Sequence, residues 1–228
     1  TKDRMFGLSL NEMPDKNNLV RNISVVPVIQ AESKAFKDKM TIEISHSTLS
    51  ERKFRGQAVF YRIIDELNKN PKFEFYSGAF EIDKTSTIET YFRESIESKG
   101  PLSATVSATF FKKPNNFTID IQSTYNPQYH AGGPEGLIDG IFGTENWRKG
   151  DWQGYQSQDF EAVIDMQSTR EMSQITANFL QDTRSWILMP TKVEYYISDD
   201  NVNFTLFDTQ NNTIDPKNYN SIINGFKS

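Results

Sequence analysis

The sequence contains no cysteine and only two histidines, His46 and His130, among its 228 residues. The absence of cysteine excludes disulfide bonds, thiolate nucleophiles and cysteine-based metal clusters. No apolar run approaches the roughly 20 residues that span a bilayer, so no transmembrane segment is expected. The net charge of −5 repels phosphate backbones, so we expect no nucleic-acid partner.

The sequence also lacks the motifs of well-understood enzymes. It has no G-x-S-x-G nucleophile elbow, no H-E-x-x-H zinc motif and no phosphate-binding loop. The two histidines fall in different predicted domains, so a Ser-His-Asp triad on either is unsupported. We expect His46 at a strand end or in a loop. No pair stands out among the 30 acidic residues. We therefore predict that this chain is not an enzyme.

What is present is a series of short β-like segments. In residues 102–110, Leu102, Ala104, Val106, Ala108 and Phe110 alternate with serine and threonine, which predicts a half-buried strand. Further strands are expected at 40–45, 58–64, 160–166, 175–180, 191–198 and 203–207. The sequence therefore predicts an all-β fold of two β-sandwich domains.

Two stretches, 61–70 and 88–98, have spacings that a helix could also explain, and we interpret both as a strand followed by a loop. The segment SDDN, 198–201, has the composition of a hairpin turn.

The charged, proline-containing segment KKPNN, 112–116, predicts a domain boundary. We accordingly expect a polar leader or linker at 1–22, a first domain at 23–113 and a second domain at 114–228.

The second half carries an ordered set of landmarks. They are GLIDGIFGT at 136–144, WQGY at 152–155, DFEAVIDM at 159–166, and the long segment from NFLQDTRSW to SDDNVNF at 178–204. This series resembles the discoidin, or coagulation factor 5/8 type C, domain, a galactose-binding-like jelly roll that many family-32 carbohydrate-binding modules share. The version it resembles most stands at the C-terminus of exported bacterial β-N-acetylhexosaminidases. The resemblance implies a periplasmic, cell-surface or extracellular location.

The first half is similar, over 59–92, to the chitobiase/hexosaminidase C-terminal domain, a small immunoglobulin-like sandwich of the fibronectin type III kind. Four residues fit that family's pattern: Tyr61, Tyr76, Gly78 and Phe80. The family's D-G pair is replaced here by Asp65 and Glu66.

Departures from the discoidin pattern limit what the resemblance implies. Trp147 fits, but Arg148 stands where galactose-binding members have histidine, and Asp182 stands about where they have arginine. Galactose specificity is therefore not transferred. In the family's calcium loop, Asp139 and Thr144 fit, which makes them a weak candidate calcium site. Ile141 occupies a usual ligand position and cannot ligate through its side chain.

The family's closing strands are missing from the pattern after Phe207. About six strands follow Lys113, whereas the family jelly roll has eight. We therefore expect a jelly roll without its closing strands, in a chain truncated at its C-terminus.

The stretch ENWRKGDWQGY, 145–155, concentrates aromatic residues in a loop. We expect Trp152 in the core and Trp147 and Tyr155 exposed, while Trp186 is compatible with either place. Pyranose rings stack on aromatic rings, and their hydroxyls need planar polar partners. The candidate carbohydrate-binding residues are Tyr129, His130, Asn146, Trp147, Arg148, Asp182, Arg184 and Trp186.

Taken with these loops, the resemblance implies a non-catalytic accessory region of an exported glycoside hydrolase. It would hold the parent catalytic domain, in the same polypeptide, near a glycan that contains N-acetylhexosamine or galactose. The same residue types also suit protein interfaces. The alternative is a structural spacer or protein-docking module without sugar binding.

Overall fold

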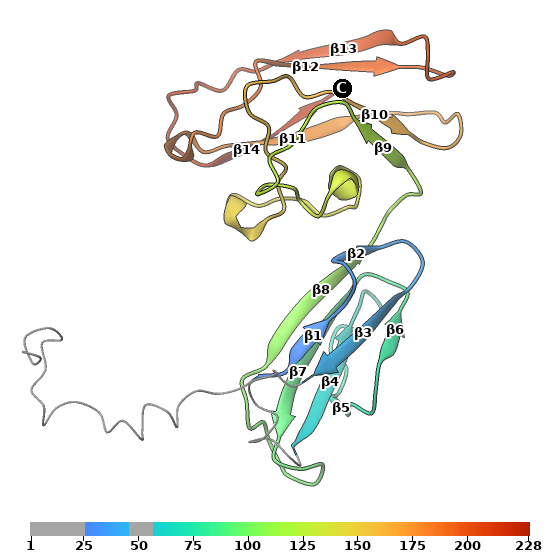
Figure 1. The fold of residues 1–228 in the computed structure, drawn as a ribbon, viewed down its shortest axis with the longest axis vertical. Helices are drawn as coiled ribbons and strands as arrows, with labels where there is room; N and C mark the ends of the chain where they lie inside the picture. Colours follow the sequence, from blue (N-terminus) through green and yellow to red (C-terminus); the bar gives the residue numbers. More distant parts are fainter. Residues whose placement is uncertain (1–25, 46–56) are drawn as a thin grey trace, which may run out of the picture. The chain divides into compact units, whose positions relative to one another are not determined.

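The computed structural model describes residues 26–45 and 57–228, and its ribbon is shown in Figure 1. The chain separates into two compact units, unit 1 ending at Lys112 and unit 2 beginning at Lys113. This division falls in the KKPNN segment. The expected leader at 1–22 lies outside the described residues.

The predicted all-β fold is confirmed: both units are built from strands, and the described helices are single short 3-10 turns. Unit 1 contains the strands β1 Val28–Gln30, β2 Ala35–Phe36, β3 Met40–Ser45, β4 Ala58–Ile64, β5 Glu74–Phe75, β6 Phe80–Ile82, β7 Ser86–Arg93 and β8 Val106–Lys112. Both stretches with ambiguous spacing are strands followed by loops, as predicted, because β4 ends at Ile64 and β7 at Arg93.

Unit 1 is a sandwich of two sheets. One sheet has the order β1-β3-β6 and the other β2-β8-β7-β4-β5, with β2 parallel to β8 and the remaining pairs antiparallel. Alternation on β3 buries Met40, Ile42 and Ile44, which share one cluster with Ile88 and Phe92 of β7. This apolar layer between the sheets is the main source of stability in unit 1.

The strand predicted at 102–110 is correct only in its second half. Val106 begins β8, whereas Leu102 is exposed and Ala104 lies outside any strand. The Ser103 hydroxyl explains the difference, since it accepts a hydrogen bond from the Phe92 amide at 2.9 Å. A side chain thus occupies the position of a ladder carbonyl and ends the regular pairing.

Unit 2 contains six strands, all within the described residues, and three 3-10 turns. They are β9 Thr118–Ile121, η2 Pro134–Leu137, η3 Trp147–Lys149, β10 Ala162–Asp165, β11 Thr176–Gln181, η4 Thr183–Ser185, β12 Lys192–Ile197, β13 Thr205–Asn211 and β14 Ile222–Lys227. The strands form three antiparallel pairs, β9 with β10, β11 with β14, and β12 with β13. The predicted SDDN turn joins β12 to β13.

Strand β14 corrects the expectation that no strand follows Phe207. Its six residues pair with all six of β11, from Thr176 opposite Lys227 to Gln181 opposite Ile222. The sequence IINGFK hides this strand because Asn224 and Gly225 interrupt its apolar pattern. Asn224 and Gly225 are tolerated because backbone hydrogen bonds to β11, rather than side-chain alternation, define the strand.

Unit 2 buries little apolar surface. Its buried apolar side chains are Leu180, Met189, Tyr195 and Phe226. The Tyr195 hydroxyl donates to the carbonyl of Phe226 at 2.6 Å and accepts from the amide of Ala177 at 3.2 Å. It therefore joins β12 to the β11–β14 pair, and burial raises its pKa. Polar bonds between elements carry much of the organisation of this unit.

None of the helices in the described part of the chain is long and apolar enough to cross a membrane.

The two-sheet core of unit 1 predicts a strong effect of Phe92→Ala. The Phe92 side chain is 1% exposed, so truncation leaves a cavity that costs about 3–5 kcal/mol in the free energy of unfolding. The control Leu67→Ala removes a side chain that is 80% exposed and should change stability by less than about 0.5 kcal/mol.

Denaturant unfolding measured by two signals tests this expectation. All three tryptophans lie in unit 2, so their fluorescence reports that unit, whereas circular dichroism reports both. Phe92→Ala should move the unit 1 transition and leave the fluorescence transition in place. Equal displacement of both signals would contradict two independently folded units.

Candidate functional site

A hydrogen bond between two distant loops organises the site in unit 2. The indole Nε1 of Trp147 donates to the Oδ2 carboxylate oxygen of Asp182 at 3.2 Å, across 35 residues of sequence. The Ser185 hydroxyl donates to the same oxygen at 2.8 Å. Asp182 therefore connects the η3 loop to the η4 loop.

Local capping shapes the η3 loop. The side chain of Asn146 accepts a hydrogen bond from the amide of Arg148 at 3.3 Å at the start of the turn. Gly150 ends the turn in the left-handed region, with φ of 83°. Asn146 and Gly150 thus fix the two ends of the turn that carries Trp147 and Arg148.

The η4 loop closes through a backbone bridge between Asp182 and Ile187, whose amides each donate to the other's carbonyl, at 3.0 and 3.1 Å. Trp186 caps the turn with φ of 59°, a conformation that costs a bulky side chain free energy. Its ring is 91% exposed. Trp186 therefore packs against little of the protein and is accessible on the surface of this loop.

A third segment, leading into β14, is tied to the same place. Gln181 is 1% exposed, and its amide donates to the carbonyls of Asp215 and Asn218 at 3.0 and 3.3 Å. The Thr183 hydroxyl donates to the carbonyls of Pro216 and Asn218 at 3.0 and 3.1 Å. These bonds position the residues that follow, 219–221, beside η4.

The three segments enclose an open hollow of about 630 Å³. It is lined by Glu145, Arg148, Asp182, Arg184, Ser185, Tyr219, Asn220 and Ser221. We call it the arginine hollow. It presents two guanidinium groups, two carboxylates and a Tyr219 side chain that is 61% exposed. Such a lining can hydrogen-bond a polyhydroxylated ligand and stack against its apolar face.

The Asp182 carboxylate is ionised at neutral pH. The hydrogen bond from Ser185 and the one from Trp147 lower its pKa, and the positive charges of Arg148 and Arg184 lower it further. A carboxylate in this state accepts hydrogen bonds and does not serve as a general acid.

The structure brings together part of the set predicted from the sequence. Arg148, Asp182 and Arg184 line the hollow. Trp147, which was expected to be exposed, is half-buried and does not line it. The Arg148 guanidinium lies 4.1 Å from the centre of the Trp147 ring, and Tyr129 meets that ring edge-on at 5.8 Å between centroids. Tyr129 and Trp147 thus support the site from the side of the η3 loop.

His130 and Trp186 do not line the hollow. The Nδ1 atom of His130 accepts a hydrogen bond from the amide of Gly132 at 3.1 Å, and its backbone bridges to Gln153. His130 therefore organises a turn. Trp186 follows Ser185, so its exposed ring stands next to the lining along the chain. The other histidine, His46, lies outside the described residues.

Sequence reasoning missed Tyr219, Asn220 and Ser221. They belong to the segment after Phe207 for which no strand was predicted. The paired polar and aromatic residues of NYNS, 218–221, were the available signal, but only the β11–β14 pairing shows that they reach η4.

Trp152 and Tyr155 both pack inside the unit. Trp152 is half-buried, as expected for a core residue, and its indole donates to the carbonyl of Thr144 at 2.8 Å. Tyr155 was expected to be exposed, and this is wrong: its ring contacts Phe160 at 4.9 Å and Tyr125 at 6.5 Å between centroids. Burial raises the pKa of Tyr155 to about 12. The neighbouring aromatic rings of Tyr125 and Phe160 account for the difference.

The weak calcium candidate has few ligands to offer. Asp139 is buried, and its Oδ1 atom accepts a hydrogen bond from the amide of Ile141 at 2.7 Å. The carbonyl of Thr144 is used by Trp152. Within the described ranges, no group of three or more acidic or histidine side chains is placed to hold a metal ion. Calcium prefers six to eight oxygens, so the residues fit it poorly, and no step is assigned to it.

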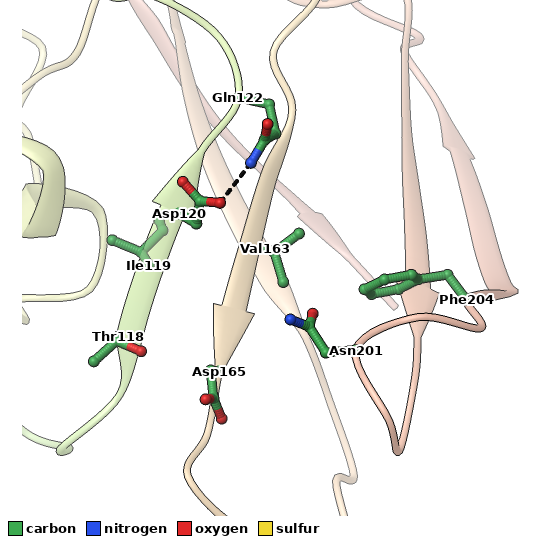
Figure 2. A pocket seen from close by; sticks show the side chains of 8 residues that line it. All are labelled: Thr118, Ile119, Asp120, Gln122, Val163, Asp165, Asn201 and Phe204. Carbon is green, nitrogen blue, oxygen red and sulfur yellow. Dashed lines mark hydrogen bonds between the residues drawn. The ribbon is translucent and has the colours of Figure 1, made fainter.

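A second hollow of about 400 Å³ lies on the β9–β10 pair (Figure 2). Asp120 and Val163 face it from paired positions, and Asn201 and Phe204 reach it from the β12–β13 turn. The Asp120 carboxylate accepts from the amide of Gln122 at 2.6 Å. Among the described residues, no cationic side chain lines this hollow, whereas two guanidinium groups line the arginine hollow, which is therefore the stronger candidate.

No protein-family model matches this chain, and no curated protein is significantly similar to it.

The charge of Asp182 predicts a pH-dependent stability. Because its folded pKa is lowered, its ionised form stabilises unit 2 above the unfolded pKa of about 3.9, and this contribution is lost as the pH falls through the folded value. Asp182→Asn should therefore lower the melting temperature at neutral pH. The difference in melting temperature between the variant and the wild type should shrink below about pH 4. Tryptophan fluorescence melts over this range measure it, and a gap that does not change with pH would contradict the assignment.

Proposed function

We propose that this chain is a non-catalytic carbohydrate-binding region whose glycan site is the arginine hollow. One observation carries the proposal: an exposed aromatic side chain, Tyr219, shares an open hollow with guanidinium, carboxylate, amide and hydroxyl groups from three loops. Sugar hydroxyls need both donors and acceptors, and the C–H face of a pyranose needs a ring. The hollow supplies hydrogen-bond donors, hydrogen-bond acceptors and an aromatic ring.

The proposed mechanism is retention of an attached enzyme near its substrate. A single weak site with a millimolar dissociation constant, about −4 kcal/mol, raises the local concentration of the glycan for a catalytic domain in the same polypeptide. The resemblance of 128–200 to discoidin-type modules supports this role, and the resemblance of 59–92 to hexosaminidase C-terminal domains supports a glycoside hydrolase as the parent protein. Both resemblances belong to exported proteins.

The lowered pKa of Asp182 makes this carboxylate unsuited to the role of general acid in glycoside hydrolysis. Glycoside hydrolysis needs one carboxyl group that stays protonated near neutral pH to protonate the leaving group. Asp182 is ionised and already accepts hydrogen bonds from Trp147 and Ser185. Its role is to hold the site together.

A glycan-array screen, followed by titration of each hit, tests the proposal. Tyr219→Ala should reduce glycan affinity about tenfold or more, because it removes the one aromatic ring in the hollow, and ring stacking contributes about 1–3 kcal/mol in other binding sites. Trp186→Ala measures whether the neighbouring exposed ring also contacts the ligand.

Tyr196→Ala is the matched control, since it removes an exposed tyrosine from β12 outside the hollow. Silence across the array from the folded chain would sink the proposal, and so would equal losses in the Tyr219 and Tyr196 variants.

A second candidate function, protein docking, is favoured by a separate observation. The β12–β13 hairpin exposes a row of large apolar side chains: Tyr196, Ile197, Val202, Phe204, Leu206 and Phe207. We call this set the hairpin patch. In Figure 1 the hairpin lies at one edge of unit 2, away from the yellow segment that holds η2 and η3. Large exposed apolar side chains gathered on one hairpin are typical of interaction sites in soluble proteins.

The double variant Leu206→Thr and Phe207→Thr tests docking. Both side chains are exposed, so the variant should fold with little change in melting temperature. If the hairpin patch docks onto the catalytic domain of the same polypeptide, the variant should lose association with that domain, added in trans and measured by sedimentation velocity. Leu67→Thr, on exposed surface of unit 1, is the control. Unchanged association in the double variant would contradict docking through the hairpin patch.

A further inference from the structure

Arg148 and Arg184 differ from the structural arginines of the chain. In unit 1, Arg62 forms an ion pair with Glu89 at 2.7 Å, and Arg93 donates to the hydroxyl of Tyr91 at 2.7 Å. Neither Arg148 nor Arg184 has an ion pair or a side-chain hydrogen bond to any residue that the structure describes. Both line the arginine hollow, so their N–H groups are available to a ligand.

The guanidinium of Arg148 is preorganised. It lies over the Trp147 ring at 4.1 Å, and the Trp147 indole is itself fixed by Asp182 at 3.2 Å. Stacking holds the plane of the guanidinium while leaving its edge free to donate. A group held in this way loses less rotamer entropy when it binds a carboxylate or a sulfate in a two-pronged arrangement.

The carboxylates of the hollow form no hydrogen bond or ion pair with these two arginines. Asp182 is within electrostatic reach of both arginines, yet it directs its Oδ2 atom to Trp147 and Ser185. Glu145 lines the hollow, and its side chain has no hydrogen bond or ion pair to any described residue, so its carboxylate is suited to accept from ligand hydroxyls. The donors of the two arginines therefore lack strong acceptors within the protein.

We propose that the arginine hollow is specific for acidic glycans, whose carboxylate or sulfate group is bound by Arg148 and Arg184 while Tyr219 supports the sugar ring. This inference rests on the proposed function. It also gives a physical role to Arg148, one of the two departures from the galactose-binding pattern. The overall charge of −5 repels polyanions at long range, so recognition depends on contact with a local anionic group rather than on attraction to a charged polymer.

Matched ligands that differ only in charge test the proposal. Trigalacturonate is compared with its methyl ester, and galactose 6-sulfate with galactose, by titration of the full chain at fixed ionic strength. We expect the acidic member of at least one pair to bind about tenfold or more tightly than its neutral partner. The pair that shows the preference identifies the group as a carboxylate or a sulfate.

Substitutions of single arginines test whether the preference for acidic ligands comes from the hollow. Arg148→Gln and Arg184→Gln should each reduce affinity for the acidic ligand about tenfold, towards that of the neutral one, with little change for the neutral ligand. Arg170→Gln is the matched control, because it removes one positive charge from unit 2 at a residue that contacts Phe117 and Ser168 and does not line the hollow. Tryptophan fluorescence melts establish that each variant is folded.

Four results would overturn the inference. Equal affinity for acidic and neutral partners would do so while leaving the proposed glycan site intact, as would binding of neutral hexosamine or galactose oligomers alone. An equal loss in Arg170→Gln would reduce the preference to general charge. Silence from acidic and neutral glycans alike would overturn the proposed function as well.

Discussion

The hydrogen bond from the Trp147 indole to the Asp182 carboxylate is the interaction on which the site in unit 2 depends. It joins two loops that the strands alone leave independent, and Ser185 completes the same acceptor. From this junction, Trp147 fixes the plane of Arg148, and η4 carries Arg184 to the other part of the lining. One ionised carboxylate thus determines where the charged groups of the hollow stand.

The two units reach stability by different means, and this difference explains where function resides. Unit 1 buries a continuous apolar layer between two sheets, and both hollows described above lie in unit 2. Unit 2 has four buried apolar side chains and relies on bonds such as those of Gln181 and Tyr195. Loops held by polar bonds keep side chains at the surface that a larger core would have buried, so the binding groups stay accessible.

Periodicity predicted most of the strands, because burial on one face imposes alternation that is visible in the sequence. It failed at Leu102, where a hydrogen bond from the Phe92 amide to the Ser103 hydroxyl replaces ladder pairing, and at β14, where an Asn-Gly pair breaks the apolar pattern. Arg148, Asp182 and Arg184 were predicted as site residues from residue type and resemblance. Tyr219 could not be predicted in this way. Its position beside η4 depends on the pairing of β11 with β14, strands about 40 residues apart, and a local sequence pattern does not encode such a pairing.

The most direct test of the central claim is a map of backbone amide chemical shifts while the isotope-labelled chain is titrated with an acidic oligosaccharide. A glycan site in the arginine hollow predicts saturable shifts that cluster at 145–148, 182–185 and 219–221 and leave unit 1 and the β12–β13 hairpin unchanged. Shifts confined to the hairpin, or none at millimolar concentrations of acidic and neutral oligosaccharides alike, would contradict it.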